Sequence, residues 1–147
     1  MDKASDNSIN KAASTGAALK ILIADDNELI RNGIRLILES CPNWLVCGEA
    51  HNGPDAVEKA VELQPDVILI DISMPQMNGF EAAKRIHERV PGAQILMVSE
   101  HDSHSLAQAG TQPGVSGYVQ KSRLGIDLIS TIESLTNQRC EAPIASD

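Results

Sequence analysis

Aromatic residues are almost missing from this chain of 147 residues, which contains one Trp, one Tyr and one Phe. The core therefore has to be built from the aliphatic residues that dominate an apolar fraction of 42%. Charged residues make up 22% of the chain, as in ordinary globular proteins. A chain of this length is long enough for one domain with a buried core and too short for two ordinary domains.

Basic residues are too few for a typical nucleic-acid-binding protein. Twelve Lys and Arg stand against 20 Asp and Glu, which gives a net charge of −8. Lys84, Arg85 and Arg89 are the only local basic cluster, and their helical spacing is typical of a solvated helix face. Because binding to phosphate backbones depends on Lys and Arg, we expect no direct nucleic-acid binding by this chain.

Cysteine is also rare, and Cys41, Cys47 and Cys140 lack the spacing of a metal or redox motif. We therefore expect three reduced thiols, as in a cytosolic protein. No apolar run is long enough to cross a membrane, and the first nineteen residues lack the apolar stretch of a signal peptide. The expected location is the cytoplasm, without membrane attachment.

Neither a GxGxxG nor a Walker motif occurs, which weighs against a nucleotide-binding enzyme. The four histidines do not have the spacing of a zinc site either. We expect them to lie on the surface or at helix ends: His51, His87, His101 and His104.

The chain does contain a regular alternation of short apolar runs and helical patterns. This alternation is typical of βαβ units, so it predicts an α/β fold with a parallel sheet. We expect a flexible extension at residues 1–18, one domain at 19–137 and a flexible tail at 138–147. Five strands are expected, each followed by a helix: residues 20–24, 44–49, 66–70, 94–98 and 117–120.

The fourth predicted helix, roughly Asp102 to Thr111, is the least well specified. It contains Gly110, runs into Pro113 and has Leu106 as its only large apolar residue. Gly costs about 1 kcal/mol relative to Ala inside a helix. We therefore expect this helix to be the least stable element of the fold.

Polar residues stand at the carboxyl ends of four predicted strands. Asp25 and Asp26 follow the first strand, Asp71 the third, Ser99 the fourth and Lys121 the fifth. Ligands of open parallel sheets bind beyond this edge. Three neighbouring carboxylates repel one another and need a cation, and all-oxygen ligands favour Mg²⁺ or Mn²⁺. The arrangement suits transfer of a phosphoryl group to a carboxylate, with the ammonium and the hydroxyl binding phosphoryl oxygens.

Each of these residues also has an ordinary structural explanation. A lone Asp after a strand is often a helix cap, and Asp26 or Asn27 is a suitable cap for the first helix. Lys121 by itself would be read as a surface charge. The occurrence of suitable residues at four strand ends favours the functional interpretation.

Three segments resemble bacterial response-regulator receiver domains: Ile21–Asn27, Pro65–Gly79 and Ser116–Ser122. The resemblance covers about residues 19–136. It implies a flavodoxin-like, doubly wound sheet of five parallel strands in the order 2-1-3-4-5, with helices on both faces. The run Ser99–Asp102 and the Gly-Tyr pair before Lys121 look most like the branch that precedes a LuxR/NarL-type helix-turn-helix domain.

The resemblance implies a role for each site residue. Asp71 is the phosphoacceptor, and the metal ligands are Asp25, Asp26, Asp71 and the backbone carbonyl of Ser73. The residues that resemble the switch pair and the phosphate-pairing lysine are Ser99, Tyr118 and Lys121, in that order.

The sequence departs from the family pattern after two of these residues. Lys121 is followed by Ser122 rather than by the Pro common in the wider family. Glu100 follows Ser99, where small or neutral residues are usual, and its charge is expected to oppose an incoming phosphoryl group.

By the same resemblance, the partner is a histidine kinase or a histidine phosphotransfer protein. The domain would catalyse its own phosphorylation and dephosphorylation without being a turnover enzyme, and it would switch a surface for an unnamed output partner or for a homodimer. Three alternatives stay open: the receiver half of a DNA-binding regulator, a receiver-like module that is never phosphorylated, and a Mg²⁺-dependent phosphohydrolase. The last needs a carboxylate two residues after the nucleophile, where this chain has Ser73.

Overall fold

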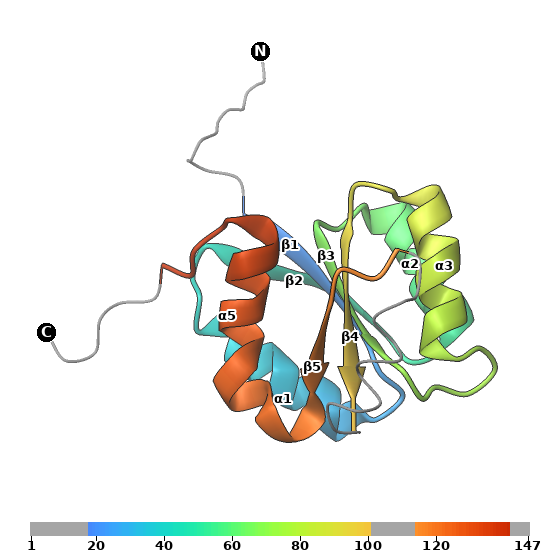
Figure 1. Ribbon diagram of the computed structural model, residues 1–147, viewed down its shortest axis with the longest axis horizontal. Coiled ribbons are helices and arrows are strands. Elements are labelled where there is room, and N and C mark those ends of the chain that lie inside the picture. Colours follow the sequence, from blue (N-terminus) through green and yellow to red (C-terminus); the bar gives the residue numbers. More distant parts are fainter. Residues whose placement is uncertain (1–17, 101–113, 142–147) are drawn as a thin grey trace, which may run out of the picture.

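Five parallel strands form one sheet in the middle of the computed structural model, which describes residues 18–100 and 114–141 (Figure 1). The strand order is β2-β1-β3-β4-β5, which confirms the predicted topology and places β2 at an edge. The strands are β1 (Leu19–Ala24), β2 (Trp44–Ala50), β3 (Val67–Asp71), β4 (Gln94–Ser99) and β5 (Gly117–Gln120).

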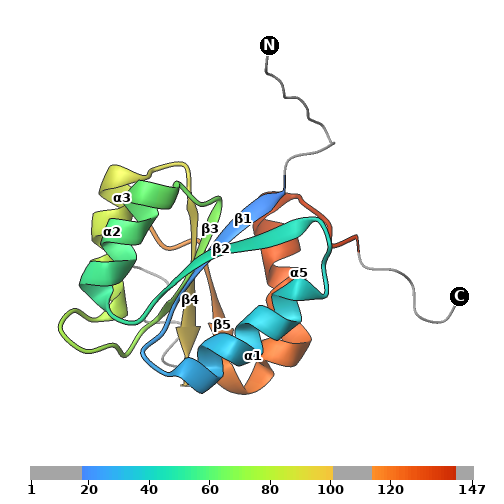
Figure 2. The same cartoon turned by 180° about the vertical axis from the view of Figure 1, so that it is seen from behind.

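Helices cover both faces of the sheet, as Figures 1 and 2 show from opposite sides. One face carries α1 (Glu28–Glu39) and α5 (Leu124–Thr136), and the other carries α2 (Gly53–Leu63) and α3 (Gly79–Arg89). A short 3₁₀ turn, η2 (Lys121–Arg123), leads from β5 into α5. The helix predicted at about 102–111 lies outside the described residues.

The strands alternate their side chains between two aliphatic clusters. In β1, Ile21 and Ile23 pack toward α1 and α5, whereas Leu22 and Ala24 pack toward α2 and α3. β3 follows the same rule, and all five of its residues are buried. Because both faces of a strand in a covered parallel sheet are buried, its sequence reads as a continuous apolar run.

Asparagine caps three of the helices directly after a strand or turn. The side chains of Asn27, Asn52 and Asn78 accept hydrogen bonds from backbone N–H groups in the first turns of α1, α2 and α3. Pro54 lies in the first turn of α2, where its missing N–H costs nothing. These caps fix the residues at which the three helices begin.

The expectation of reduced thiols is wrong for two of the three cysteines. Cys41 and Cys140 form a disulfide across 99 positions of sequence, while Cys47 is free. Sequence spacing gave no sign of the pair because the two cysteines meet only through the tertiary fold. Residues 138–141, the first part of the predicted tail, lie beside this bond. Residues 1–17 and 142–147 are outside the described part.

Within residues 18–100 and 114–141, no helix combines the length and the hydropathy that crossing a membrane requires.

Candidate functional site

The carboxyl ends of β1, β3 and β4 bring three polar residues to one edge of the sheet. Asp25 follows β1, and Asp71 and Ser99 are the last residues of β3 and β4. The three residues are almost inaccessible to solvent, with exposed fractions of 1%, 3% and 1%. Since hydrophobic strands carry these groups into the core, the structure brings them together as the sequence predicted.

Asp26 completes a cluster of three carboxylates and is its exposed member. One oxygen each from Asp25, Asp26 and Asp71 lies within 4.8 Å of the other two. Asn27, rather than Asp26, caps α1: its Oδ1 accepts the N–H of Leu29 at 2.8 Å. The capping explanation for Asp26 therefore fails.

Backbone N–H groups fix the two buried carboxylates. Oδ1 of Asp25 accepts the N–H of Asn27 at 2.8 Å, and Oδ1 of Asp71 accepts the N–H of Ser73 at 3.1 Å. In each pair the donor lies two residues beyond the acid. These local bonds set the orientation of each carboxylate and leave the second oxygen of each facing the site.

Lys121 is the cation of the site. Its Nζ lies 3.3 Å from Oδ2 of Asp71 and 3.4 Å from Oδ2 of Asp25. The Lys121 side chain is only 13% exposed, so it is not an ordinary surface charge. A third carboxylate, Glu100, approaches Nζ with Oε2 at 3.5 Å. Glu100 was expected to oppose the phosphoryl group, but its contact with Lys121 was not predicted from the sequence.

The electrostatics of the site follow from burial of like charges. Burial raises the pKa of Asp71 to about 6, and the charge of Asp25 adds to the rise, while the Ser73 N–H and Lys121 oppose it. Burial also raises the pKa of Asp25. Burial lowers the pKa of Lys121, but the attraction of Asp25 and Asp71 outweighs it, so that this pKa is raised overall. Lys121 alone therefore does not compensate the negative charge of the two buried carboxylates.

The residues present fit a hard divalent cation. Oδ2 of Asp25 is buried and accepts no hydrogen bond from the described residues, although it lies beside Lys121. A buried carboxylate oxygen without a donor is costly unless a charge compensates it. Oxygens bound to Mg²⁺ at about 2.1 Å lie about 3 to 4.2 Å apart, so small side-chain adjustments bring the three carboxylates into this range. The cluster is therefore a candidate metal site.

The loop after β3 folds back against Asp71, and Gly79 makes this possible. The Gly79 N–H donates to the carbonyl of Ile72 at 2.8 Å. A Cβ atom at position 79 would collide with the backbone carbonyl of Asp71 and the Cα of Ile72. Glycine is therefore required for the loop to pass so close to the acid.

The remaining predicted residues lie near this edge. Tyr118 is half-buried in β5, where burial raises the pKa of its hydroxyl, and it pairs with Met97 of the adjacent strand β4. Ser99 pairs with Gln120, which directly precedes Lys121. Ser73 is exposed in the loop after Asp71, and the role of its carbonyl as a metal ligand stays a prediction. His101 and His104 lie outside the described residues.

Comparison with known proteins gives one family. Residues 21–133 match the model of the response regulator receiver domain. The transcriptional regulatory protein YdfI of Bacillus subtilis is 36% identical over 115 residues, which cover 78% of this chain and 54% of the relative. Response regulator UvrY of Escherichia coli is 38% identical over 130 residues, or 88% of this chain and 58% of the relative. The chain thus spans about half the length of these curated relatives.

Solved structures agree with the fold. The response regulator domain of Thermotoga maritima CheB matches with a TM-score of 0.74 and 30% identity, covering 82% of this chain and 98% of that one. A LuxR-family two-component response regulator from Aurantimonas matches with a TM-score of 0.75 and 30% identity, covering 86% and 91%.

The raised pKa of Asp71 leads to a prediction for the metal-free protein. An acid with a higher pKa in the folded than in the unfolded chain binds its proton more tightly when folded. The stabilisation from this proton is complete below the ordinary value of 3.8 and is lost as the pH rises through about 6. Carboxyl ¹³C NMR should therefore show Asp71 titrating near pH 6.

Lys121→Met should move this midpoint upward, because removal of the ammonium further disfavours the carboxylate. Lys84→Met, which changes an exposed lysine on α3, is the matched control and should leave it in place. An Asp71 midpoint near 4 in the wild type would contradict the electrostatic description.

Proposed function

Because this chain belongs to the response regulator receiver domain family, we propose that it is the phosphoacceptor switch of a two-component signalling system, with Asp71 as the acceptor. The observation that carries the proposal is the position of Lys121, whose ammonium lies within 3.4 Å of the carboxylates of both Asp25 and Asp71. A cation in this place is available to an incoming phosphoryl group. The donor is a phosphohistidine of a kinase or of a phosphotransfer protein.

The reaction is a transfer of one phosphoryl group. A carboxylate oxygen of Asp71 attacks phosphorus, the P–N bond of the donor breaks, and its electron pair stays on the imidazole nitrogen. Lys121 then pairs with a phosphoryl oxygen, and the hydroxyl of Ser99 donates a hydrogen bond to another. Hydrolysis of the acyl phosphate by water returns Asp71. The chain's role is that of a switch rather than a turnover enzyme.

Mg²⁺, with Mn²⁺ as an alternative, is the proposed cofactor of this site. Asp25, Asp26 and Asp71 would hold it together with the backbone carbonyl of Ser73. When bound, it neutralises charge that develops on the transferring phosphoryl group. Oδ2 of Asp25, which accepts no hydrogen bond from the described residues and has Lys121 as its ion-pair partner, and the short distances within the cluster support this assignment.

The switch itself involves the β4–β5 edge of the sheet. Ser99 ends β4, and Tyr118 lies on β5 beside it, so a phosphoryl group that draws Ser99 inward changes the space around Tyr118. The surface that changes serves an output partner or a second copy of the chain. The proposed compartment is the cytoplasm, where the kinases of such systems have their catalytic parts.

A second candidate function is supported by the length of the relatives. YdfI is named a transcriptional regulatory protein, and this chain covers 54% of it. The chain would then be the receiver half of a DNA-binding regulator. A phosphohydrolase is less consistent with the site, because Ser73 stands where such an enzyme needs a carboxylate.

The first test is phosphorylation by acetyl phosphate and Mg²⁺, followed by intact-mass measurement. One phosphoryl group that is labile to hydroxylamine should be added, since an acyl phosphate is expected. Asp71→Asn should abolish the addition, whereas Asp127→Asn, which changes a carboxylate on α5, should not. Undiminished labelling of Asp71→Asn would show that another residue is the acceptor.

Removal of a metal ligand gives a second prediction. Calorimetric titration with Mg²⁺ should show binding that weakens at least about tenfold in Asp26→Ala, which corresponds to about 1.4 kcal/mol. Binding should also weaken as the pH falls through about 6, because protons compete for Asp71. Asp66→Ala is the control, because Asp66 directly precedes β3 and so lies at the opposite end of the strands from the carboxylate cluster. Equal affinities of Asp26→Ala and the wild type would exclude the metal site.

Glu100 should slow phosphorylation, because its carboxylate shares Lys121 with Asp71. An exposed ion pair is worth about 0.2–1 kcal/mol, so Glu100→Gln should raise the rate with acetyl phosphate about 1.5- to 5-fold. The gain should shrink at high salt. Glu81→Gln removes the partner of Arg85 and is the matched control. An unchanged rate in Glu100→Gln would show that this contact does not limit the reaction.

A further inference from the structure

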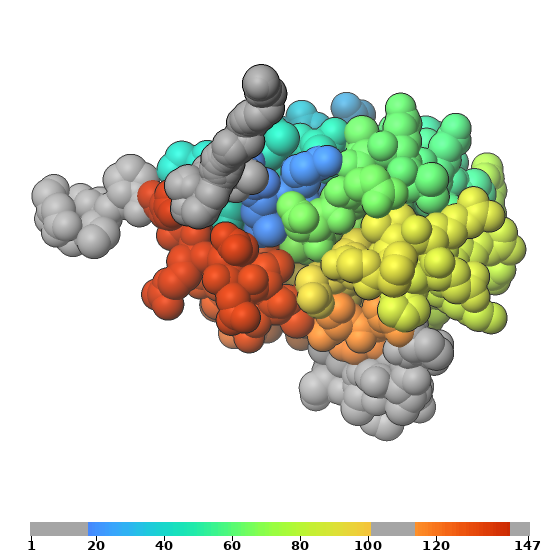
Figure 3. Space-filling model, turned by 90° about the horizontal axis from the view of Figure 1, so that it is seen from above, coloured from blue at the N-terminus to red at the C-terminus, as the bar shows by residue number. Residues whose placement is uncertain are grey.

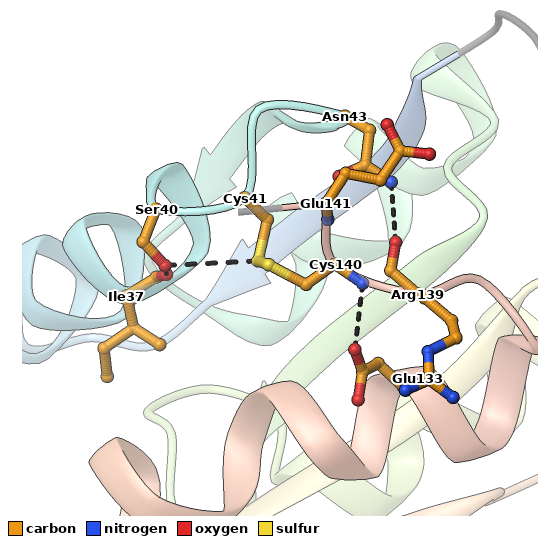
Figure 4. The surroundings of a disulfide bond; sticks show 8 residues. All are labelled: Ile37, Ser40, Cys41, Asn43, Glu133, Arg139, Cys140 and Glu141. Carbon is orange, nitrogen blue, oxygen red and sulfur yellow. Dashed lines mark hydrogen bonds between the residues drawn. A yellow bond between two sulfur atoms is a disulfide. The ribbon is translucent and has the colours of Figure 1, made fainter. Parts of the chain in front are cut away.

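The Cys41–Cys140 disulfide joins the chain beyond α1 to the chain beyond α5 (Figure 4). Cys41 lies two residues after α1 ends at Glu39, and Cys140 lies four residues after α5 ends at Thr136. The two helices pack on the same face of the sheet (Figures 1 and 2). The bond therefore links the segments that follow the C-terminal ends of α1 and α5.

Hydrogen bonds hold the same segment in place. The side chain of Asn43 donates to the carbonyl of Arg139 at 2.7 Å and accepts the N–H of Glu141 at 2.9 Å. The N–H of Cys140 donates to Oε2 of Glu133 at 2.9 Å. We call the disulfide and these three hydrogen bonds the clasp.

The clasp lies at the edge of the sheet opposite the carboxylate site. Cys41 comes shortly before β2 begins, whereas Asp71 is the last residue of β3, and the strands are parallel. In Figure 3, which looks at the edge where the strands begin, the end of α5 and the segment after it (red) lie at the surface. The proposed phosphoryl chemistry therefore makes no use of the clasp, which needs an explanation of its own.

The surroundings of the bond suit reversible reduction. Cys41 is fully buried and Cys140 is partly exposed, so Cys140 is the more accessible of the two residues to an external thiol. After reduction, the hydrogen bonds of Asn43 and Glu133 are the remaining contacts of the clasp; they hold the segment less firmly than the disulfide but keep Cys140 near enough to Cys41 for the bond to reform. Cys47 packs on the other face of the sheet, and burial raises the pKa of its thiol, so it is a poor competitor.

We propose that Cys41 and Cys140 form a reversible thiol–disulfide site, whose redox state decides whether residues 139–141 are fixed to the turn between α1 and β2. The reaction partners are low-molecular-weight thiols or a protein dithiol. The proposed cytoplasmic location agrees with such a role, because disulfides of reducing compartments are mostly transient or redox-sensing. This inference is independent of phosphorylation.

The exchange proceeds in two balanced steps. A thiolate attacks the sulfur of Cys140, the protein S–S bond breaks, and its electron pair leaves on Cys41, which takes a proton from water. A second thiolate attacks the outer sulfur of the mixed disulfide. This step releases the oxidised small disulfide and the Cys140 thiolate. Two thiols are oxidised, and the protein disulfide is reduced.

The test uses the full chain equilibrated in glutathione buffers of increasing oxidised fraction. Differential alkylation and mass spectrometry should give a midpoint at which Cys41 and Cys140 convert together while Cys47 stays reduced. The backbone N–H of Trp44, the only tryptophan, donates to the carbonyl of Cys41, so the fluorescence of this residue provides a second signal of the same transition. The variant Cys47→Ser should give the same midpoint.

Hydrogen exchange then measures the consequence. Reduction should lower protection at residues 139–141 at least about tenfold and leave β1 and β3 unchanged, and reoxidation should restore it. Cys140→Ser should behave like the reduced wild type. Three results would each overturn the proposal: no bond in oxidised glutathione, a bond that resists reduction until the domain unfolds, or unchanged protection after reduction.

Discussion

The balance of charge around Lys121 is the interaction on which the site depends. Its ammonium lies between Asp25 and Asp71, two buried acids that would otherwise repel each other without compensation. One cation does not satisfy them, since the pKa of Asp71 is still raised to about 6. This excess of negative charge supports the proposed divalent cation, in whose presence Lys121 would be able to pair with an anion that adds to Asp71.

The fold brings these groups together because the carboxyl ends of its parallel strands lie at the same edge of the sheet. Hydrophobic residues on both faces of β1 and β3 anchor the strands, and their last positions can then hold polar groups in a fixed place. Local backbone bonds from Asn27 and Ser73 orient the acids, and Gly79 lets the loop pass close to Asp71. Stability and function thus use separate parts of the same strands.

The sequence was sufficient to predict the sheet and the grouping of polar residues at one edge of it, because both depend on patterns along the chain. Apolar runs mark the strands, and the residue after each run marks the functional edge. The contact of Glu100 with Lys121 was missed because it joins two different strand ends through side-chain rotamers. The disulfide was missed because its cysteines are 99 positions apart. One signal was available: both cysteines follow helices that a doubly wound fold places on the same face.

The most direct test of the central claim is a crystal structure of the chain with Mg²⁺ and beryllofluoride, a mimic of the phosphoryl group. We expect an adduct on Asp71. Nζ of Lys121 should have moved from Glu100 to a fluorine atom, the hydroxyl of Ser99 should donate to another fluorine, and Mg²⁺ should be bound by Asp25 and Asp26. An adduct at a different residue, or Lys121 still paired with Glu100 and remote from the adduct, would contradict it.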